Sequence, residues 1–230
     1  IRDRVGGGSG YDYSRLQNPT REHLEKIVAS LEEGIDALAF STGMAAITAL
    51  MEIFKPGDHI IIDEDLYGGS VRLFHSINVK NGLTFTSVDL SSVDVEDYIQ
   101  DNTKAIYAET PTNPMMRVSD LEELSKKAKK HELLLIVDNT FLSPYFQNPL
   151  KLGADIVVHS GTKYLGGHND TLAGFLITNR EDIQEQLRFI IKTTGATLAP
   201  MDSWLILRGI KTLGVRMDLS LIHISEPTRR

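Results

Sequence analysis

Short apolar runs alternate with stretches of helical periodicity along this chain, and this alternation constrains its fold more than any other feature. Strands separated by helices favour a mostly parallel sheet that is covered on both faces. We therefore predict an α/β fold with a mostly parallel seven-stranded sheet and helices on both faces. The predicted strands are Ala37–Phe40, His59–Ile62, Thr84–Val88, Ala105–Ala108, Leu133–Val137, Asp155–Val158 and Ala173–Ile177.

Capping signals mark the helices as well as periodicity. Asn18 can cap a first helix that has Pro19 at its first position, and Gly34 is expected to stop it. A capping box, formed by Ser119 and Glu122, is predicted to open a later helix. Between the strands, helices are predicted over Met44–Phe54, Val71–Asn78, Leu121–His131 and Arg180–Ile191.

The composition limits the class of protein. At 230 residues and 41% hydrophobic, the chain is long enough for one large α/β core, and no internal repeat or interdomain linker divides it. The 24 basic and 31 acidic residues give a net charge of -7, so we expect no nucleic-acid partner. The absence of cysteine excludes a disulfide framework, a Cys-type zinc site and a thiol nucleophile. Every apolar run is far shorter than the roughly 20 residues that span a bilayer, so we expect a soluble protein with no membrane partner. The absence of cysteine fits a reducing compartment, so we expect a cytoplasmic location.

Ligands of open α/β sheets bind at the carboxyl ends of the strands, so the residues that follow each apolar run are the most informative. Lys163 follows one such run on a short loop, and a lysine amine there can form a Schiff base with an aldehyde cofactor. Ser160 and Thr162 flank it with hydroxyls, which can bind a phosphate or be ordinary turn residues.

Two further strand ends support a cofactor site. Ser41–Met44 form a small-residue turn into a helix, where free N–H groups favour a phosphate; a plain helix cap is the alternative. Asp138 follows a buried run and needs a positive partner. That partner is either the pyridine nitrogen of pyridoxal 5'-phosphate (PLP) or, if Asp138 merely caps the next turn, a backbone donor.

The segment His159–Asp170 resembles the PLP-lysine signature of the Cys/Met-metabolism PLP enzymes, the family of cystathionine γ-synthase, cystathionine lyases, methionine γ-lyase and O-acylhomoserine sulfhydrylases. The resemblance covers roughly Gly10 to Met217 and implies the type I PLP fold, which is aspartate-aminotransferase-like. Other segments that match the family are Tyr13–Arg15, Asn18–Arg21, Thr42–Ala46, Tyr67–Gly69, Glu109–Pro114, Val137–Thr140 and Leu207–Leu213.

This resemblance implies PLP as the cofactor and assigns roles to the matching residues. Lys163 is the implied Schiff-base lysine and proton shuttle, Asp138 binds the pyridine nitrogen, and Tyr67 stacks on the ring as a candidate acid or base. The functional unit is expected to be at least a homodimer, and a homotetramer for the parent protein. The other implied cofactor contacts are Gly43, Met44, Ser160 and Thr162 at the phosphate, Asn113 near the 3'-oxygen, and Tyr13 and Arg15 at the phosphate of a neighbouring subunit.

The implied activity is β- or γ-elimination, or γ-replacement, on sulfur amino acids such as cystathionine or an O-acylhomoserine, in cysteine and methionine metabolism. Methionine γ-lyases commonly carry a cysteine where this chain has Gly69, which favours the cystathionine enzymes. Three alternatives stay open: methionine γ-lyase or O-acylhomoserine sulfhydrylase activity in the parent, an aminotransferase of the same broad fold, and a PLP-binding fragment without catalysis.

The chain is expected to divide into an incomplete N-terminal arm (1–17), a PLP-binding large domain (18–217) and a tail outside the family pattern (218–230). The tail resembles a translated sequencing adapter, and we expect a truncated parent whose C-terminal domain, which supplies the arginine for the substrate carboxylate, is missing. His168 and Asp170 are expected to be structural, not metal ligands, and Trp204 is expected in the core.

Overall fold

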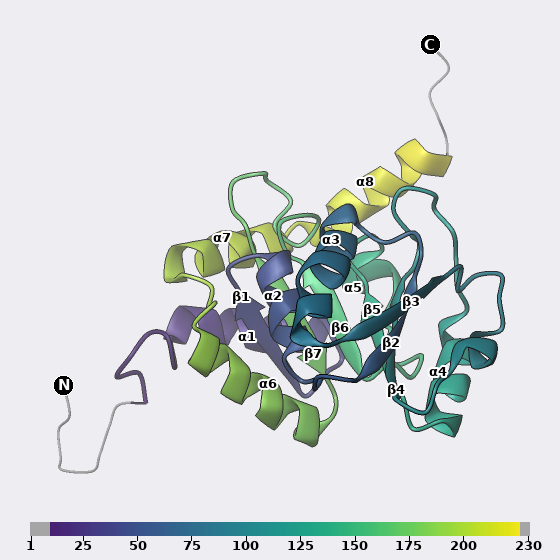
Figure 1. Ribbon diagram of the computed structural model, residues 1–230. Coiled ribbons are helices and arrows are strands. Elements are labelled where there is room, and N and C mark those ends of the chain that lie inside the picture. Colours follow the sequence, from purple (N-terminus) through teal and green to yellow (C-terminus); the bar gives the residue numbers. More distant parts are fainter. Residues whose placement is uncertain (1–9, 226–230) are drawn as a thin grey trace.

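A seven-stranded sheet lies at the centre of the computed structural model, which describes residues 10–225 and the side chains of residues 10–221 (Figure 1). Its order is β1-β7-β6-β5-β4-β2-β3, and only β7 runs antiparallel to its neighbours. The predicted α/β class and all seven predicted strands are confirmed, with ends that agree to within two residues. The strands are β1 Asp36–Phe40, β2 His59–Asp63, β3 Thr84–Val88, β4 Thr103–Glu109, β5 Leu134–Asp138, β6 Ile156–Ser160 and β7 Gly174–Thr178.

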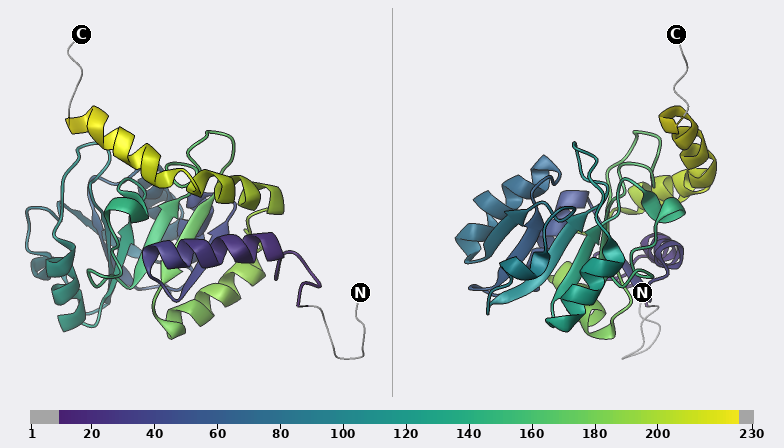
Figure 2. Two further views of the ribbon diagram at one scale, coloured as in Figure 1. Left: turned by 180° about the vertical axis from the view of Figure 1, so that it is seen from behind. Right: turned by 90° about the vertical axis from the view of Figure 1, so that its right-hand side faces the viewer.

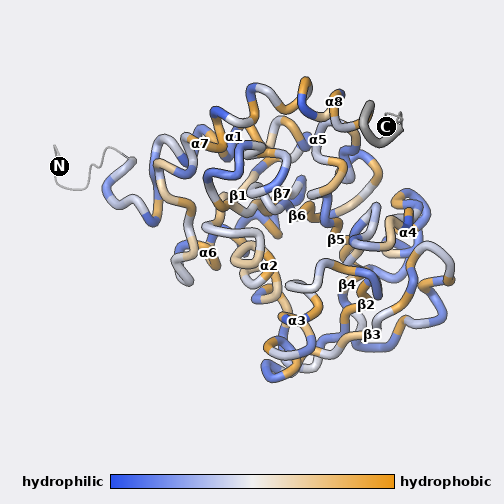
Figure 3. Tube along the Cα trace, turned by 90° about the horizontal axis from the view of Figure 1, so that it is seen from above, coloured by the Kyte–Doolittle hydropathy of each residue, from blue (hydrophilic) through white to orange (hydrophobic). Residues whose placement is uncertain are grey.

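Helices cover both faces of the sheet, as predicted (Figure 2). One face packs against α2 (Gly43–Met51), α3 (Gly68–Ser76) and α6 (Glu181–Thr194), with Leu38 and Phe40 of β1 pointing into that layer. Viewed from above, α2 carries mostly hydrophobic residues along its length, because it packs against the sheet and against its neighbours α3 and α6 (Figure 3). The other face packs against α1 (Pro19–Glu32), α4 (Leu121–Lys130), α7 (Pro200–Ile210) and α8 (Leu213–Ser225).

Short elements complete the fold. They are α5 (Ser143–Phe146) and the 3-10 helices η1 (Asn78–Asn81) and η2 (Val95–Tyr98). Within residues 10–225, no helix has the length and the hydropathy that a membrane crossing requires. The predicted arm is described only over residues 10–17, and the first part of the predicted tail continues α8 as far as Ser225.

Helix α1 begins as predicted, but it ends for a different reason. The Asn18 side chain accepts hydrogen bonds from the N–H groups of Thr20 and Arg21, so it is the N-cap. The left-handed residue at the other end is Glu33 (φ 59°), not Gly34. A Cβ on Gly34 would lie 2.5 Å from Ile177 Cγ2, so this glycine is needed for the close approach of α1 to β7 and not for its own backbone angle.

The capping box predicted for α4 is wrong by one residue. The N-cap is Asp120, whose carboxylate accepts a hydrogen bond of 3.0 Å from the N–H of Glu123. Ser119 is buried, and its own N–H donates to Thr110 Oγ1. Ser119 therefore anchors the chain to the loop after β4, and the next residue caps the helix.

Trp204 was expected in the core, and this prediction is wrong. Its side chain is 51% exposed on α7, and the Arg208 guanidinium lies over its ring at 5.9 Å. The face of α7 that meets the sheet layer consists of Ser203, Ile206 and Gly209, which leaves Trp204 on the outer side.

Candidate functional site

All six parallel strands end at the same edge of the sheet, and the antiparallel β7 begins there. A cavity of about 220 Å³ opens at this edge. The structure brings eight of the ten predicted site residues together in its lining: Gly43, Met44, Tyr67, Asn113, Asp138, Ser160, Thr162 and Lys163.

The first turn of α2 forms one end of this cavity. Thr42 caps the helix through a 2.9 Å bond from Ala45 N–H to its hydroxyl. The N–H groups of Gly43 and Met44 have no hydrogen-bond partner among the described residues, so they are available to an anion. A Cβ on Gly43 would lie 3.1 Å from Ser160 Cβ, and a Cβ on Gly174 would lie 2.1 Å from Thr42 O. Two glycines therefore let this turn pack directly against β6 and β7.

Asp138 lies in the middle of the cavity, at the end of β5. Its Oδ1 accepts hydrogen bonds from the N–H (3.0 Å) and the hydroxyl (2.6 Å) of Thr140. The Thr140 hydroxyl in turn accepts from Ser160 N–H at 2.8 Å, which ties the ends of β5 and β6 together. Burial raises the pKa of the Asp138 carboxyl, and the two bonds from Thr140 oppose that rise. The backbone-cap alternative thus accounts for one oxygen of Asp138, and a buried acid with a raised pKa still favours a cationic partner in the cavity.

Lys163 projects from the loop that connects β6 to β7. This loop is closed by hydrogen bonds at both ends: Lys163 N–H donates to Ser160 O at 3.2 Å, and Ala173 N–H donates to Thr162 Oγ1 at 3.1 Å. The lysine side chain is exposed within the chain and lines the cavity together with Asp138. A loop closed by hydrogen bonds thus presents an exposed amine to the cavity that the buried Asp138 also lines.

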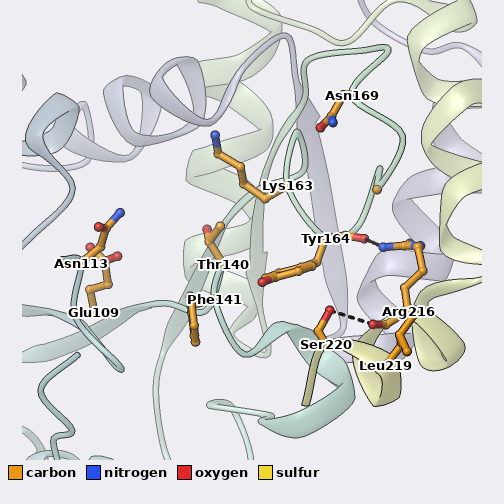
Figure 4. Close-up of a pocket in the computed structure, with 11 residues that line it drawn as sticks. Glu109, Asn113, Thr140, Phe141, Lys163, Tyr164, Asn169, Arg216, Leu219 and Ser220 are labelled. Atoms are coloured by element: carbon orange, nitrogen blue, oxygen red, sulfur yellow. Dashed lines mark hydrogen bonds between the residues drawn. The ribbon is translucent and has the colours of Figure 1, made fainter. Parts of the chain in front are cut away.

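A second, larger cavity of about 540 Å³ adjoins the first, and Figure 4 shows its lining. Lys163, Glu109, Asn113 and Thr140 line both cavities. In this view, Asn113 and Glu109 lie on one side of Lys163, and Arg216, Leu219 and Ser220 of α8 lie on the other side.

Arg216 holds in place the part of α8 that lines the larger cavity. Its guanidinium donates to Tyr164 O at 2.7 Å and to Gly209 O at 2.9 Å. The loop after Lys163 has a glycine at this contact, Gly167, whose φ of 71° favours glycine; an added Cβ would also lie 2.2 Å from Arg216 Cζ. Burial lowers the pKa of Arg216, and the carbonyl oxygens that it binds offset the cost of burying it.

Tyr67 is placed at the start of α3 and has a half-exposed side chain. Its N–H donates to Glu109 Oε2 at 2.9 Å. A Cβ on Gly69 would lie 2.3 Å from Tyr67 Cε1 and 3.0 Å from Met44 Sδ, so the ring packs over this glycine. Tyr67 is thereby held between the first turns of α2 and α3.

Glu109 and Thr140 line the cavity but were not among the predicted site residues. Burial, and next the charge of Asp138, raise the pKa of Glu109 to about 8. The sequence contains a signal that could have identified Glu109, since this acid comes at the end of an apolar run just as Asp138 does. Thr140 gave a weaker signal, because a hydroxyl two residues after an acid is also typical of an ordinary turn.

Tyr13 and Arg15 do not reach this cavity in their own chain. Arg15 stacks on the Tyr13 ring at 5.0 Å, and its guanidinium donates to Lys192 O at the end of α6. Tyr13 is 55% exposed. Their predicted role toward a neighbouring subunit therefore stays a prediction.

The two predicted structural residues after the lysine have partners other than a metal. Asp170 pairs with Arg208, and His168 Nδ1 lies 2.8 Å from Gly166 O.

The donor set of the cavity fits PLP. Free N–H groups at the start of α2 and the Ser160 hydroxyl suit a phosphate, the buried Asp138 suits a protonated pyridine nitrogen, and Lys163 suits an aldehyde. The α/β fold and this site together define a PLP-dependent enzyme of type I.

The chain belongs to the Cys/Met metabolism PLP-dependent enzyme family, whose profile matches residues 3–221. Cystathionine γ-lyase of Bacillus subtilis is 53% identical over 216 residues, which are 94% of this chain and 57% of the relative. Cystathionine γ-synthase/O-acetylhomoserine (thiol)-lyase of the same species is 52% identical over 214 residues, covering 93% of this chain and 57% of the relative. The family resemblance inferred from the sequence is confirmed.

Solved structures share the fold. Cystathionine γ-lyase from Lactobacillus plantarum, complexed with L-serine, superposes with a TM-score of 0.91 at 42% identity. The superposition covers 100% of this chain and 63% of the Lactobacillus plantarum chain. Cystathionine γ-synthase from Xanthomonas oryzae, in complex with aminoacrylate and cysteine, gives a TM-score of 0.91 at 39% identity and covers 94% and 56%. The chain thus spans less than two thirds of the length of these relatives.

Proposed function

We propose that the parent of this chain catalyses PLP-dependent β- or γ-elimination, or γ-replacement, on sulfur amino acids of the cystathionine or O-acylhomoserine class. The observation that carries the proposal is the convergence of Lys163, Asp138 and the Gly43 turn on one cavity that adjoins a second, larger one. The substrate class is supported by relatives named cystathionine γ-lyase, cystathionine β-lyase and cystathionine γ-synthase/O-acetylhomoserine (thiol)-lyase.

The proposed roles follow from the donors and acceptors at the site. Bound PLP supplies an electron sink that stabilises negative charge on a substrate carbon. The Gly43 and Met44 N–H groups and the hydroxyls of Ser160 and Thr162 bind the phosphate. Asp138 holds a proton at the pyridine nitrogen, because a buried carboxylate is stabilised by a cation beside it.

The remaining roles concern the reacting end of the cavity. Lys163 Nζ binds the cofactor aldehyde and moves protons between substrate carbons. Tyr67 lies over the cavity as a stacking ring and as an acid or base for the leaving sulfur, and Asn113 lies near the 3'-oxygen. Tyr13 and Arg15 bind the phosphate held by a neighbouring subunit.

The proposal extends to assembly and location. A parent in which Tyr13 and Arg15 complete a neighbouring site is at least a homodimer, and we propose a cytoplasmic homotetramer. In the same proposal, residues 18–217 form the PLP-binding domain, residues 1–17 are part of an arm, and residues 218–230 are a tail outside the family.

A direct experiment tests the cofactor half of the proposal. The 230-residue chain is incubated with PLP, reduced with borohydride and digested, and the modified peptide is located by mass spectrometry. We expect a visible absorption band before reduction and the adduct on Lys163, with Lys211 as an internal control for nonspecific labelling. An adduct spread over exposed lysines, with no preference for Lys163, would refute the assignment.

Turnover is tested with cystathionine, methionine and O-acylhomoserines on the full-length parent. Release of pyruvate or 2-oxobutyrate from cystathionine supports a lyase, and formation of cystathionine from an O-acylhomoserine and cysteine supports a synthase. A parent that binds PLP on Lys163 but acts on none of these substrates would refute the proposed activity.

A further inference from the structure

Glu109 has no role in the proposed function, although it is one of four residues that line both cavities. It ends β4 and is the register partner of Asp138 on β5. Both residues are only 7% exposed. Two carboxyl groups therefore share one buried edge of the sheet, and burying both of them has an electrostatic cost.

The carboxyl of Glu109 makes one specific contact. Oε2 accepts the 2.9 Å hydrogen bond from Tyr67 N–H. Tyr67 is the N-cap of α3 and makes no side-chain capping bond, while its carbonyl accepts from Ser70 N–H at 2.8 Å and from Val71 N–H at 3.2 Å. The backbone of Tyr67 is thus held by α3 on one side and by Glu109 on the other.

The ring of Tyr67 depends on this anchoring. Its side chain is 49% exposed, and the ring packs over Gly69, where an added Cβ would lie 2.3 Å from Tyr67 Cε1. The Tyr67 ring lines the same cavity as Lys163 and Asp138. A shift of the Tyr67 backbone would therefore move the ring relative to these two residues.

We propose that Glu109 is a positioning residue for Tyr67, and that it fixes the ring over the cofactor cavity through the hydrogen bond that it accepts from Tyr67 N–H. The inference rests on the proposed function, because it assigns Tyr67 a place against PLP. Glu109 acts through Tyr67 and does not itself contact the cofactor in this proposal.

Protonation of Glu109 is compatible with this role. Burial is the main cause that raises the pKa of the Glu109 carboxyl, and the like charge of Asp138 raises it further. The hydrogen bond from Tyr67 N–H opposes this rise, and the charges of Asp63 and Asp65 add to it. The acid therefore keeps its proton near neutral pH, and Oε2 still accepts from Tyr67 N–H. A glutamine at this position is neutral and has the same acceptor, so Glu109→Gln is a matched control for the removal of the bond.

The test compares Glu109→Ala, Glu109→Gln, Tyr67→Ala and the double alanine variant of the 230-residue chain at pH 7. PLP affinity is measured from the visible absorption band, and the environment of the bound ring from visible circular dichroism. Loss of one hydrogen bond predicts that Glu109→Ala weakens PLP binding about fivefold and reduces the dichroism of the cofactor. Glu109→Gln should stay within twofold of wild type, and Glu109→Ala should have no further effect when Tyr67 is already alanine.

A second measurement does not depend on PLP. Amide hydrogen exchange of Tyr67 in the cofactor-free chain should be faster in Glu109→Ala than in wild type and nearly unchanged in Glu109→Gln. If wild type fails to bind PLP on Lys163 but Tyr67 exchange responds in this way, the proposed function fails and the anchoring by Glu109 stands.

Three outcomes would overturn the inference. The first is that Glu109→Ala changes neither the PLP affinity, nor the dichroism of the cofactor, nor the amide exchange of Tyr67. The second is that Glu109→Ala weakens PLP binding as much in the Tyr67→Ala background as in wild type. The third is that Glu109→Gln weakens PLP binding as much as Glu109→Ala does. If the alanine variant does not fold, Glu109→Met fills the volume without an acceptor, and the same comparison decides.

Discussion

Replacement of Glu109 by glutamine should change how the stability of the cofactor-free chain depends on pH. The ordinary pKa of a glutamic acid is 4.5, and burial beside Asp138 raises it to about 8 in the folded chain. Between these values the folded chain keeps a proton that the unfolded chain has lost. The stability associated with the protonated acid is fully present below pH 4.5 and is lost as the pH rises through about 8.

The size of the effect follows from the same two values. Each pH unit between them lowers the free energy of unfolding by up to about 1.4 kcal/mol, so the upper limit over the whole interval is roughly 5 kcal/mol. The residue is 7% exposed, so solvent screening is small. Glutamine does not titrate, so its variant lacks this loss.

Urea denaturation at pH 5, 6, 7, 8 and 9, followed by far-ultraviolet circular dichroism, measures the difference. We expect Glu109→Gln to gain stability relative to wild type with each pH step, and the gain to level off above pH 8. Glu122→Gln, at an exposed position of α4, is the matched control and should give a curve parallel to wild type. Parallel curves for wild type and Glu109→Gln from pH 5 to 8 would refute the assignment of a raised pKa to this carboxyl.

Three substitutions test the geometry of the cavity. Gly43→Ala should weaken PLP binding about tenfold, because its Cβ would lie 3.1 Å from Ser160 Cβ and would displace the first turn of α2 from β6. Titration with PLP, followed by absorbance, measures the affinity, and an unchanged affinity would contradict the prediction. Gly174→Ala should lower the free energy of unfolding, measured in urea, by about 1–3 kcal/mol, since its Cβ would lie 2.1 Å from Thr42 O. Gly68→Ala, where an added Cβ has nothing within 4 Å, is the control and should change the stability far less. Equal effects of the two substitutions would show that the contact with Thr42 does not determine the loss of stability. Lys163→Ala should leave no PLP adduct after borohydride reduction while the far-ultraviolet spectrum is retained, and a persistent adduct at the expected mass would show that another lysine binds the aldehyde.

Most strands were predictable because they are nearly continuous apolar runs, whereas β3 has only two apolar residues among five. A strand buried on both faces can tolerate few polar residues, and β2, β5 and β7 carry this signal plainly. Helix ends were less predictable, because Ser119 and Asp120 are both good caps and the choice between them depends on which one the loop after β4 buries.

The lining of the cavity was predictable where a residue lies at or just after the end of a strand, and less so where the pairing of two strands brings residues together. Lys163 and Asp138 follow from their places after apolar runs. Glu109 lies beside a second carboxyl only because β4 and β5 pair in a register that places it opposite Asp138. The sequence around either residue does not reveal this register. The exposure of Trp204 is also a tertiary effect, since the inward face of α7 is set by its packing against α1.

The antiparallel strand β7 has a consequence for how this protein is made. It lies between β1 and β6 and joins the Gly43 turn to the Ser160 end of the cavity, although β1 is among the first elements to be synthesised. A nascent chain that has emerged only as far as β6 lacks β7, the strand that pairs with β1 in the sheet. We therefore expect the end of the cavity between Gly43 and Ser160 to form only after β7 has left the ribosome, because β7 is the strand that joins β1 to β6.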